Sequence, residues 1–302
     1  MNSSSNSHLG LLATEARNPA SAHLDELSTL EMLGVMNDED AKVAGAVRAE
    51  LPAIARAVDA IAKRFGEGGR LFYIGAGTSG RLGVLDASEC PPTFSVPADL
   101  VQGLIAGGDR ALRLSSEHSE DSPEEGARDL EAAAFSRQDV LVGIAASGRT
   151  PYVLGAVEHA KKLGALTVGL SCVPGSALAQ AAEIAITPAT GAEVLTGSTR
   201  LKAGTATKLV LNMISTGVMV KTGLTYGNLM VNVRPTNAKL VDRAQRIVME
   251  ATGSDRATAE RVLEAAGMDV KTAIVMQRLN LVRAEAETKL VAAKGVLRVA
   301  LS

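Results

Sequence analysis

Five short runs of apolar residues, separated by helical stretches, constrain the fold of this chain more than any other feature. Strands buried on both faces read as continuous apolar runs, whereas half-buried strands alternate apolar and polar residues. Strand-like runs that alternate with helices are typical of an α/β fold. We therefore expect a doubly wound, five-stranded parallel sheet with right-handed connections, built from residues 70–77, 100–108, 139–147, 166–172 and 183–188.

Helical segments precede and follow this α/β region. Apolar residues recur at helical spacing from residue 24 to residue 64, and Pro52 stands where a helix can begin. Residues 196–223 predict a long buried helix with a polar start, and the chain looks wholly helical beyond Lys239. Glycine is favoured just past helix ends, and three glycines close predicted helices there: Gly253, Gly267 and Gly295. The expected parts are an N-terminal helical lead-in, an α/β domain and a small C-terminal helical domain, at 1–60, 61–224 and 239–302.

Composition and charge exclude several classes of partner. Lys and Arg total 31 against 33 for Asp and Glu, so no basic surface predicts binding to nucleic acid or to an anionic membrane. Cys90 and Cys172 match no metal or redox spacing, and the four histidines form no metal-binding pattern. The start of the chain lacks a signal-peptide pattern, and the apolar stretch 209–220 is too short to span a bilayer. We expect a cytoplasmic protein without a metal or a redox cofactor.

The first apolar run ends in a glycine-rich turn, Gly75-x-Gly77-x-x-Gly80. Such a turn before a helix leaves backbone N–H groups pointing at an anion beside the helix N-terminus. A dinucleotide site would also need an acidic residue about 20 positions further on, at the end of the second strand. Asp99 comes before that strand and Asp109 comes too late, which disfavours a dinucleotide. A phosphate site and a purely structural tight turn are both consistent with the glycines.

A second turn of small and hydroxyl-bearing residues, 145–153, follows the third apolar run. Because the carboxyl ends of parallel strands meet at one edge of a sheet, Ser147 and Thr150 should converge with Thr78 and Ser79 on one crevice. Hydroxyls and amides with few cations suit a phosphomonoester better than a pyrophosphate. The alternative is that Ser147 and Thr150 only cap a helix.

The two turns, GAGTSGRL and ASGRTPYV, resemble those of the sugar isomerase (SIS) domain, a phosphosugar-binding fold with a five-stranded parallel sheet. Longer stretches are similar to the N-acetylmuramic acid 6-phosphate etherase family: LDASECPPT, GLIAGG, GAEVLTGSTRLKAGTATKLVLNM and YGNLMV, together with TEARN and STLEMLGVMNDED near the N-terminus. This resemblance covers almost the whole chain. Glucokinase regulatory protein, a relative without the enzyme's role, shares parts of these signatures.

The resemblance implies two catalytic carboxylates. Etherases carry one catalytic Glu in DASEC and another just before DS, which correspond here to Glu89 and Glu120. We expect Glu89 to be buried, because its sequence neighbours offer no salt-bridge partner, and Asp86 is its competitor. The alternative places Glu89 at a solvated helix end and Glu120 in a solvated acidic loop.

The resemblance also implies the residues that hold the substrate. Lys202, with the hydroxyls before it, is expected near the sugar or its lactyl carboxylate, although it could instead be an exposed helix charge. The expected substrate-binding set is Gly77, Thr78, Ser79, Ser147, Gly148, Thr150, Ser198, Thr199 and Lys202.

The reaction implied by the resemblance is cleavage of the D-lactyl ether of N-acetylmuramic acid 6-phosphate by elimination and water addition. Glu89 is expected to protonate the departing D-lactate, and Glu120 to act at C2 or on the incoming water. Two alternatives on the same fold are a phosphosugar sensor without turnover and an aldose–ketose phosphate isomerase.

The resemblance bears on assembly as well. SIS domains commonly pair, so a homodimer is expected, and residues 209–220 could supply its face or belong to the core. The C-terminal helices resemble a ubiquitin-associated-type three-helix module, which here is expected to be a packing or dimer element.

Overall fold

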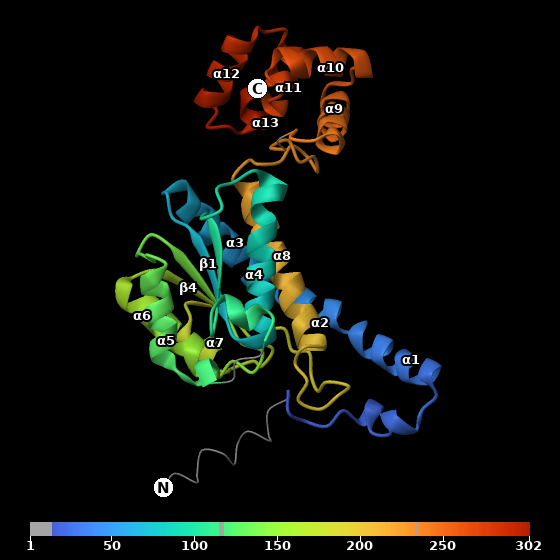
Figure 1. Ribbon diagram of the computed structural model, residues 1–302, viewed down its shortest axis with the longest axis vertical. Helices are drawn as coiled ribbons and strands as arrows, with labels where there is room; N and C mark the ends of the chain where they lie inside the picture. The colour runs from blue at the N-terminus through green and yellow to red at the C-terminus, as the bar shows by residue number, and fades with distance from the viewer. Residues whose placement is uncertain (1–13, 115–117, 234) are drawn as a thin grey trace. The chain divides into compact units, whose positions relative to one another are not determined.

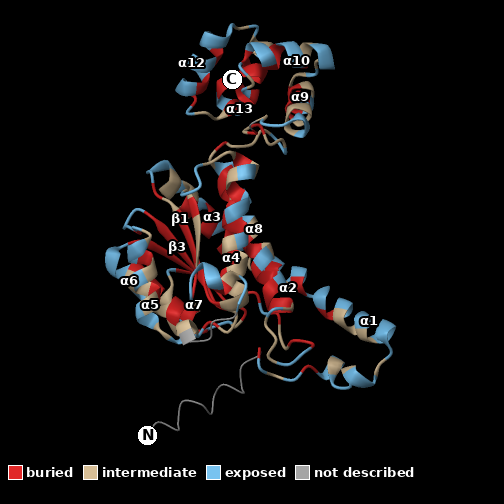
Figure 2. Cartoon of the chain, viewed as in Figure 1, coloured by how far each residue is buried: buried red, intermediate tan, exposed pale blue. Residues whose placement is uncertain are grey.

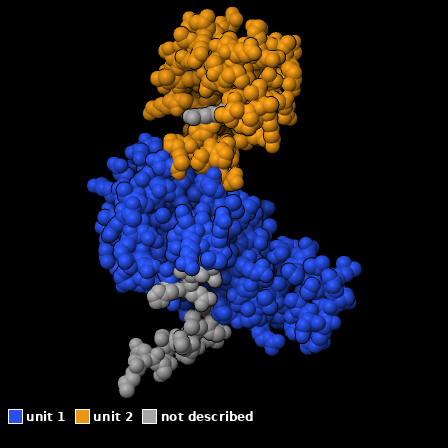
Figure 3. All heavy atoms as spheres, in the orientation of Figure 1, with its two compact units in different colours: residues 1–88, 99–215 blue, residues 89–98, 216–302 orange. Residues whose placement is uncertain are grey.

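The computed structural model describes residues 14–114, 118–233 and 235–302. The chain forms two compact units, one of residues 1–88 and 99–215 and one of residues 89–98 and 216–302 (Figure 3). Two long helices, α4 (Gly77–Phe94) and α8 (Lys202–Lys221), contribute residues to both units. The domain boundaries expected from the sequence stay a prediction.

The first unit contains a five-stranded sheet in which every neighbouring pair is parallel (Figure 1). The strand order is β2-β1-β3-β4-β5, and Leu71 of β1 pairs with Val101 of β2 on one side and Val140 of β3 on the other. The five expected strands are therefore confirmed, as β1 (Leu71–Gly75), β2 (Val101–Ile105), β3 (Val140–Ile144), β4 (Leu166–Leu170) and β5 (Ile184–Ile186).

Burial on both faces explains the continuous apolar runs. Every residue of β1, β3 and β4 is buried, and Figure 2 shows these strands in red between flanking helices. Phe72, Leu141 and Tyr152 are among the side chains that join the sheet to its helices in one core. The doubly wound α/β fold is confirmed. The remaining α-helices of this unit are α1 (Thr29–Asp40), α2 (Val43–Ala49), α3 (Leu51–Gly66), α5 (Pro123–Ala132), α6 (Pro151–Leu163) and α7 (Ala177–Ala181).

Asp86 joins three elements inside the first unit. Its buried carboxylate on α4 accepts hydrogen bonds from Tyr73 Oη of β1 at 2.9 Å. Asn212 Nδ2 and Ser215 Oγ of α8 donate to the same carboxylate at 2.6 and 3.2 Å. A buried carboxylate needs such donors to offset its lost hydration. Asp86 therefore holds α4 and α8 to the sheet.

The second unit consists largely of helices packed around an apolar core that includes Val248 and Leu263. Gly253, Gly267 and Gly295 follow three of these helices with positive φ, which confirms their expected place at helix ends. No helix in the described ranges is long and apolar enough to cross a membrane. The helices are α9 (Ala238–Thr252), α10 (Arg256–Ala265), α11 (Val270–Leu279), α12 (Arg283–Ala292) and α13 (Leu297–Ala300).

Candidate functional site

The glycine-rich turn between β1 and α4 brings two backbone segments into close contact. A Cβ on Gly75 would lie 2.8 Å from the nitrogen of Gly80, and a Cβ on Gly80 would lie 2.6 Å from the oxygen of Gly75. Gly77 begins α4 with φ of 51°, a conformation that favours glycine. The turn therefore presents Thr78, Ser79 and the first amides of α4 at the carboxyl end of β1.

The turn between β3 and α6 is built in a similar way. Gly148 has φ of 68°, and a Cβ there would lie 2.2 Å from Ser176 Oγ. Ser147 precedes it, and Thr150 is the N-cap residue of α6 without a side-chain capping hydrogen bond. Thr150 Oγ1 instead donates to Glu120 Oε1 at 3.2 Å. The Thr150 hydroxyl is therefore not a helix cap.

Both turns open onto one pocket. β1 and β3 are neighbours in the sheet, and the chain leaves them toward opposite edges, which makes this the switch point where α/β folds bind ligands. A cavity of about 200 Å³ lies there. Its hydroxyls come from Thr78, Ser79, Ser147, Thr150 and Thr199, and its carboxylates from Glu15 and Glu120.

The electrostatics of this pocket combine two carboxylates, Glu15 and Glu120, with two helix N-termini. No Lys or Arg is among the described residues that line it. Arg81, in the first turns of α4, donates instead to the carbonyl oxygens of Ala111 and Leu112 at 2.8 and 3.1 Å. Positive potential comes from the N-termini of α4 and α6, whose dipoles and open amides favour an anion such as a phosphate.

A larger hollow of the first unit lies apart from this chemistry. It measures about 430 Å³ and is bordered by Leu24, Met32 and Leu195, among others. Its walls come from the N-terminal segment, α1 and the loop before α8 and include no residue of the two turns. The smaller pocket at the strand ends is therefore the candidate site.

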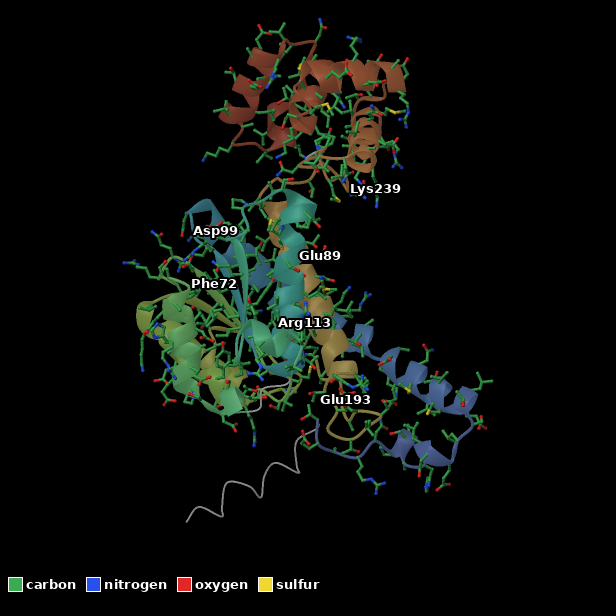
Figure 4. The ribbon with its side chains drawn as sticks, viewed as in Figure 1. Phe72, Glu89, Asp99, Arg113, Glu193 and Lys239 are labelled. Atoms are coloured by element: carbon green, nitrogen blue, oxygen red, sulfur yellow. The ribbon has the colours of Figure 1, made fainter. Side chains whose placement is uncertain are left out.

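The structure brings Glu120, but not Glu89, to this pocket. Glu120 lies in a short 3-10 helix, His118–Asp121, and its carboxylate lines the cavity. Glu89 lies on α4 ten residues beyond Ser79, or about 15 Å along a helix axis. Glu89, labelled on α4 in Figure 4, is exposed, and it is not among the residues that line the pocket. The expected burial of Glu89 is wrong, and Asp86 is the buried carboxylate of this helix.

The predicted residues near the start of α8 have different surroundings. Thr199 lines the pocket, whereas Ser198 and Lys202 do not. Lys202 is 2% exposed, and its Nζ lies 2.6 Å from Glu39 Oε2, so the alternative of an exposed helix charge is wrong. Hydrogen bonds from Lys202 and Lys42 lower the pKa of Glu39 to about 2. The contact of Lys202 with substrate stays a prediction.

Glu193 and Asn18 extend this buried network. Glu193, labelled in Figure 4, is 1% exposed and accepts hydrogen bonds from the first two backbone N–H groups of α8 at 2.9 and 3.0 Å. Asn18 Nδ2 donates to Glu39 Oε2 at 2.9 Å and to the oxygen of Ala192 at 3.1 Å. The network thus ties the N-terminal segment to the loop that supplies part of the pocket wall.

Five lining residues were missing from the predicted set: Ala76, Ala145 and Ala146, which lie in the two turns, and Glu15 and Gly197, which do not. Glu15 belongs to TEARN, which served only as part of the resemblance, and Gly197 belongs to GAEVLTGSTRLKAG. Glu15 and Gly197 lie outside the two turns that directly follow β1 and β3. The one sequence signal for Glu15 is that an acidic residue stands in a family motif N-terminal to the α/β domain.

Comparison with known proteins identifies the family. Residues 53–161 match the glucokinase regulatory protein N-terminal SIS domain, and residues 111–216 match the SIS domain. An N-acetylmuramic acid 6-phosphate etherase from Aeromonas hydrophila subsp. hydrophila is 60% identical over 289 residues, which cover 96% of this chain and 97% of that protein. The etherase from Pasteurella multocida is 57% identical over 291 residues, with 96% and 97% covered. The chain belongs to the N-acetylmuramic acid 6-phosphate etherase family.

This family membership confirms the resemblance found in the sequence. A third etherase, from Vibrio parahaemolyticus, is 56% identical over 294 residues, which cover 97% of this chain and 98% of that protein. The two SIS matches together span residues 53–216. Both glycine-containing turns and the loop before α8 lie within that span, so the SIS matches include most of the residues that line the pocket.

Replacing Glu39 by Gln should lower the free energy of unfolding of this etherase-family protein by about 3 kcal/mol at pH 7, because the buried Lys202 ammonium loses its anion. The lowered pKa of Glu39 means that its contribution is complete above about pH 4.5 and is lost as the pH falls toward 2. The difference in unfolding free energy between wild type and E39Q should therefore shrink over that range. Urea denaturation at a series of pH values measures it.

D38N is the matched control for this experiment, because Asp38 is an exposed carboxylate on the same helix. It should leave the free energy of unfolding within about 0.5 kcal/mol of wild type. A wild-type-minus-E39Q difference that is the same at pH 7 and near pH 2 would contradict the role of the Glu39–Lys202 pair.

Proposed function

We propose that this protein cleaves the D-lactyl ether of N-acetylmuramic acid 6-phosphate, giving N-acetylglucosamine 6-phosphate and D-lactate. The pocket at the ends of β1 and β3 carries the proposal, since its hydroxyls and helix N-termini suit a phosphate monoester and its wall holds Glu120. The etherases that match nearly the full chain support the same carbon–oxygen lyase activity.

The phosphate is held by neutral donors. Thr78 and Ser79 on one turn and Ser147 and Thr150 on the other donate their hydroxyl protons to its oxygens. Gly77 and Gly148, by their positive φ, let the backbone of both turns approach the same anion. Binding at this end of the pocket leaves the sugar carbons beside the wall that carries Glu120.

The reaction is an elimination followed by an addition. Opening of the sugar ring exposes an aldehyde at C1, which acidifies the proton on C2. A base removes that proton, a double bond forms between C2 and C3, and the C3–oxygen bond breaks as the lactyl oxygen takes up a proton. Water then adds its hydroxyl at C3 and a proton returns to C2. The C1 carbonyl holds the electrons during both steps, so there is no net oxidation or reduction.

Two glutamates share the proton transfers in this proposal. Glu120 takes the C2 proton or activates the water. Its carboxylate accepts the Thr150 hydroxyl proton in this structure, and in the substrate complex that hydroxyl rotates to donate to the phosphate, which leaves the Glu120 oxygen free to accept a proton. Glu89 protonates the departing lactate, the role implied by the family resemblance. Since Glu89 of a given chain is not part of that chain's pocket lining, the scheme requires a second chain.

A homodimer would supply that second chain, and exposed apolar side chains support one. Leu85, one turn before Glu89, is 52% exposed. On α8, Met213 and Val220 lie two turns apart and are 39% and 48% exposed, while most of their apolar neighbours on the helix are buried. Exposed apolar side chains on these two helices would be removed from water in a contact between two chains. In the proposed dimer the partner covers them and each pocket receives the other subunit's Glu89.

A phosphosugar sensor is the second candidate function. The match of residues 53–161 to the regulatory protein's SIS domain favours it. A sensor would bind the phosphosugar without releasing lactate, so a lactate assay separates the two functions.

For the enzyme, the proposed location is the cytoplasm, where thiols such as Cys90 and Cys172 stay reduced.

Replacing Glu120 or Glu89 by Gln should reduce the rate of D-lactate release by at least about 10²-fold, because each variant loses a proton-transfer group. Both variants should still bind N-acetylglucosamine 6-phosphate, since the hydroxyls of the two turns are intact. E158Q, on the exposed side of α6, is the control and should release lactate at the wild-type rate. Near-normal turnover of either variant would remove that glutamate from the mechanism.

Co-expression of E89Q and E120Q chains tests the shared site. In a twofold dimer, random pairing makes half of the dimers hybrids, and each hybrid has one pocket with both glutamates intact. The mixture should therefore recover about a quarter of the wild-type lactate release per site. A mixture as inactive as the two separate variants would contradict the exchange of Glu89 between subunits.

A further inference from the structure

The pocket contains one carboxylate that has no role in the proposed mechanism. Glu15 lines the same cavity as the phosphate-facing hydroxyls and Glu120. It comes from the segment before α1, far in sequence from the turns of the sheet. Its place in the pocket therefore depends on long-range contacts of that segment.

Buried neighbours on both sides fix the chain around Glu15. Thr14 is 1% exposed and Asn18 is 7% exposed. Asn18 is held through its Nδ2 by Glu39 and the oxygen of Ala192, and its Oδ1 accepts a hydrogen bond from a backbone N–H two residues on. A carboxylate on a fixed backbone loses less conformational entropy when it binds a ligand than one on a mobile terminus.

The carboxylate lies over a turn that leaves room for it. Glu15 Oε2 is 3.1 Å from the point where a Cβ on Gly197 would stand, and Gly197 has φ of 76°. Within the described residues, no hydrogen bond or ion pair to the Glu15 side chain occurs. The Glu15 carboxylate thus keeps its hydrogen-bonding capacity for a ligand in the pocket.

Charge decides which part of a ligand can face Glu15. A carboxylate repels a phosphate dianion, and because Glu15 is exposed, water screens part of this repulsion without changing its sign. The phosphate therefore belongs at the hydroxyl-lined N-termini of α4 and α6. The cavity of about 200 Å³ is several times the roughly 30 Å³ share of one water molecule, so it also admits the adjoining sugar carbons.

We propose that Glu15 is a substrate-binding residue whose carboxylate accepts hydrogen bonds from the O–H and N–H groups of the sugar. It makes the pocket selective for a phosphosugar over inorganic phosphate, because it attracts the sugar's donors and repels a second anion. This inference rests on the proposed function, since it takes the pocket's ligand to be a phosphosugar.

Calorimetric titration of E15A and E15Q with two ligands tests the inference. N-acetylglucosamine 6-phosphate should bind E15A about 10-fold more weakly than wild type, because hydrogen bonds to a charged acceptor are lost. Inorganic phosphate should bind E15A and E15Q at least as tightly as wild type, because a like charge is removed. E15Q, which keeps an amide oxygen as acceptor, should bind the phosphosugar with an affinity between those of E15A and wild type.

E26Q is the matched control, because Glu26 is an exposed carboxylate on the same N-terminal segment, and it should change neither affinity. In an assay of lactate release, the weaker substrate binding of E15A should appear mainly as a raised KM. Unchanged phosphosugar affinity in E15A would overturn the inference, and so would an equal loss for both ligands, which would make Glu15 only a structural support. A wild-type protein that binds neither ligand would instead contradict the proposed function itself.

Discussion

The close approach of β1 to the start of α4 is the constraint on which the site depends. Gly75 and Gly80 lie so near each other that a Cβ on either would stand less than 3 Å from the other's backbone. A side chain at either position would push the N-terminus of α4 away from the sheet edge. Thr78 and Ser79 would then no longer meet the turn that follows β3, and the two sets of phosphate donors would separate.

A buried polar network holds the other wall of the pocket. Glu39 and Lys202 neutralise each other, and Asn18 joins their pair to the N-terminal segment. Glu193 caps α8 with its carboxylate and so fixes the loop that carries Thr199. Buried charges of this kind are costly unless they are paired and hydrogen-bonded, and here the pairing positions chain segments far apart in sequence.

Local signals in the sequence were enough to predict the five strands, the glycine turns and the hydroxyls at their ends. They failed where helix orientation or long-range contacts decide. On α4 the buried positions 80, 83, 86, 87, 90 and 94 carry Gly, Gly, Asp, Ala, Cys and Phe, whereas the exposed positions 85, 88, 89 and 92 include Leu85. Because glycine and aspartate are among the buried residues and a leucine is exposed, the apolar spacing did not indicate that Glu89 is exposed. Glu15 reaches the pocket only through the network around Asn18, which no spacing in the sequence reveals.

A crystal structure with N-acetylglucosamine 6-phosphate bound would test the central claim most directly. The account predicts the phosphate group within hydrogen-bonding distance of the hydroxyls of Thr78, Ser79, Ser147 and Thr150, at the N-termini of α4 and α6. It predicts no Lys or Arg of the same chain against that group. A phosphate found elsewhere, or one held by cationic side chains while these hydroxyls make no contact with it, would contradict the account.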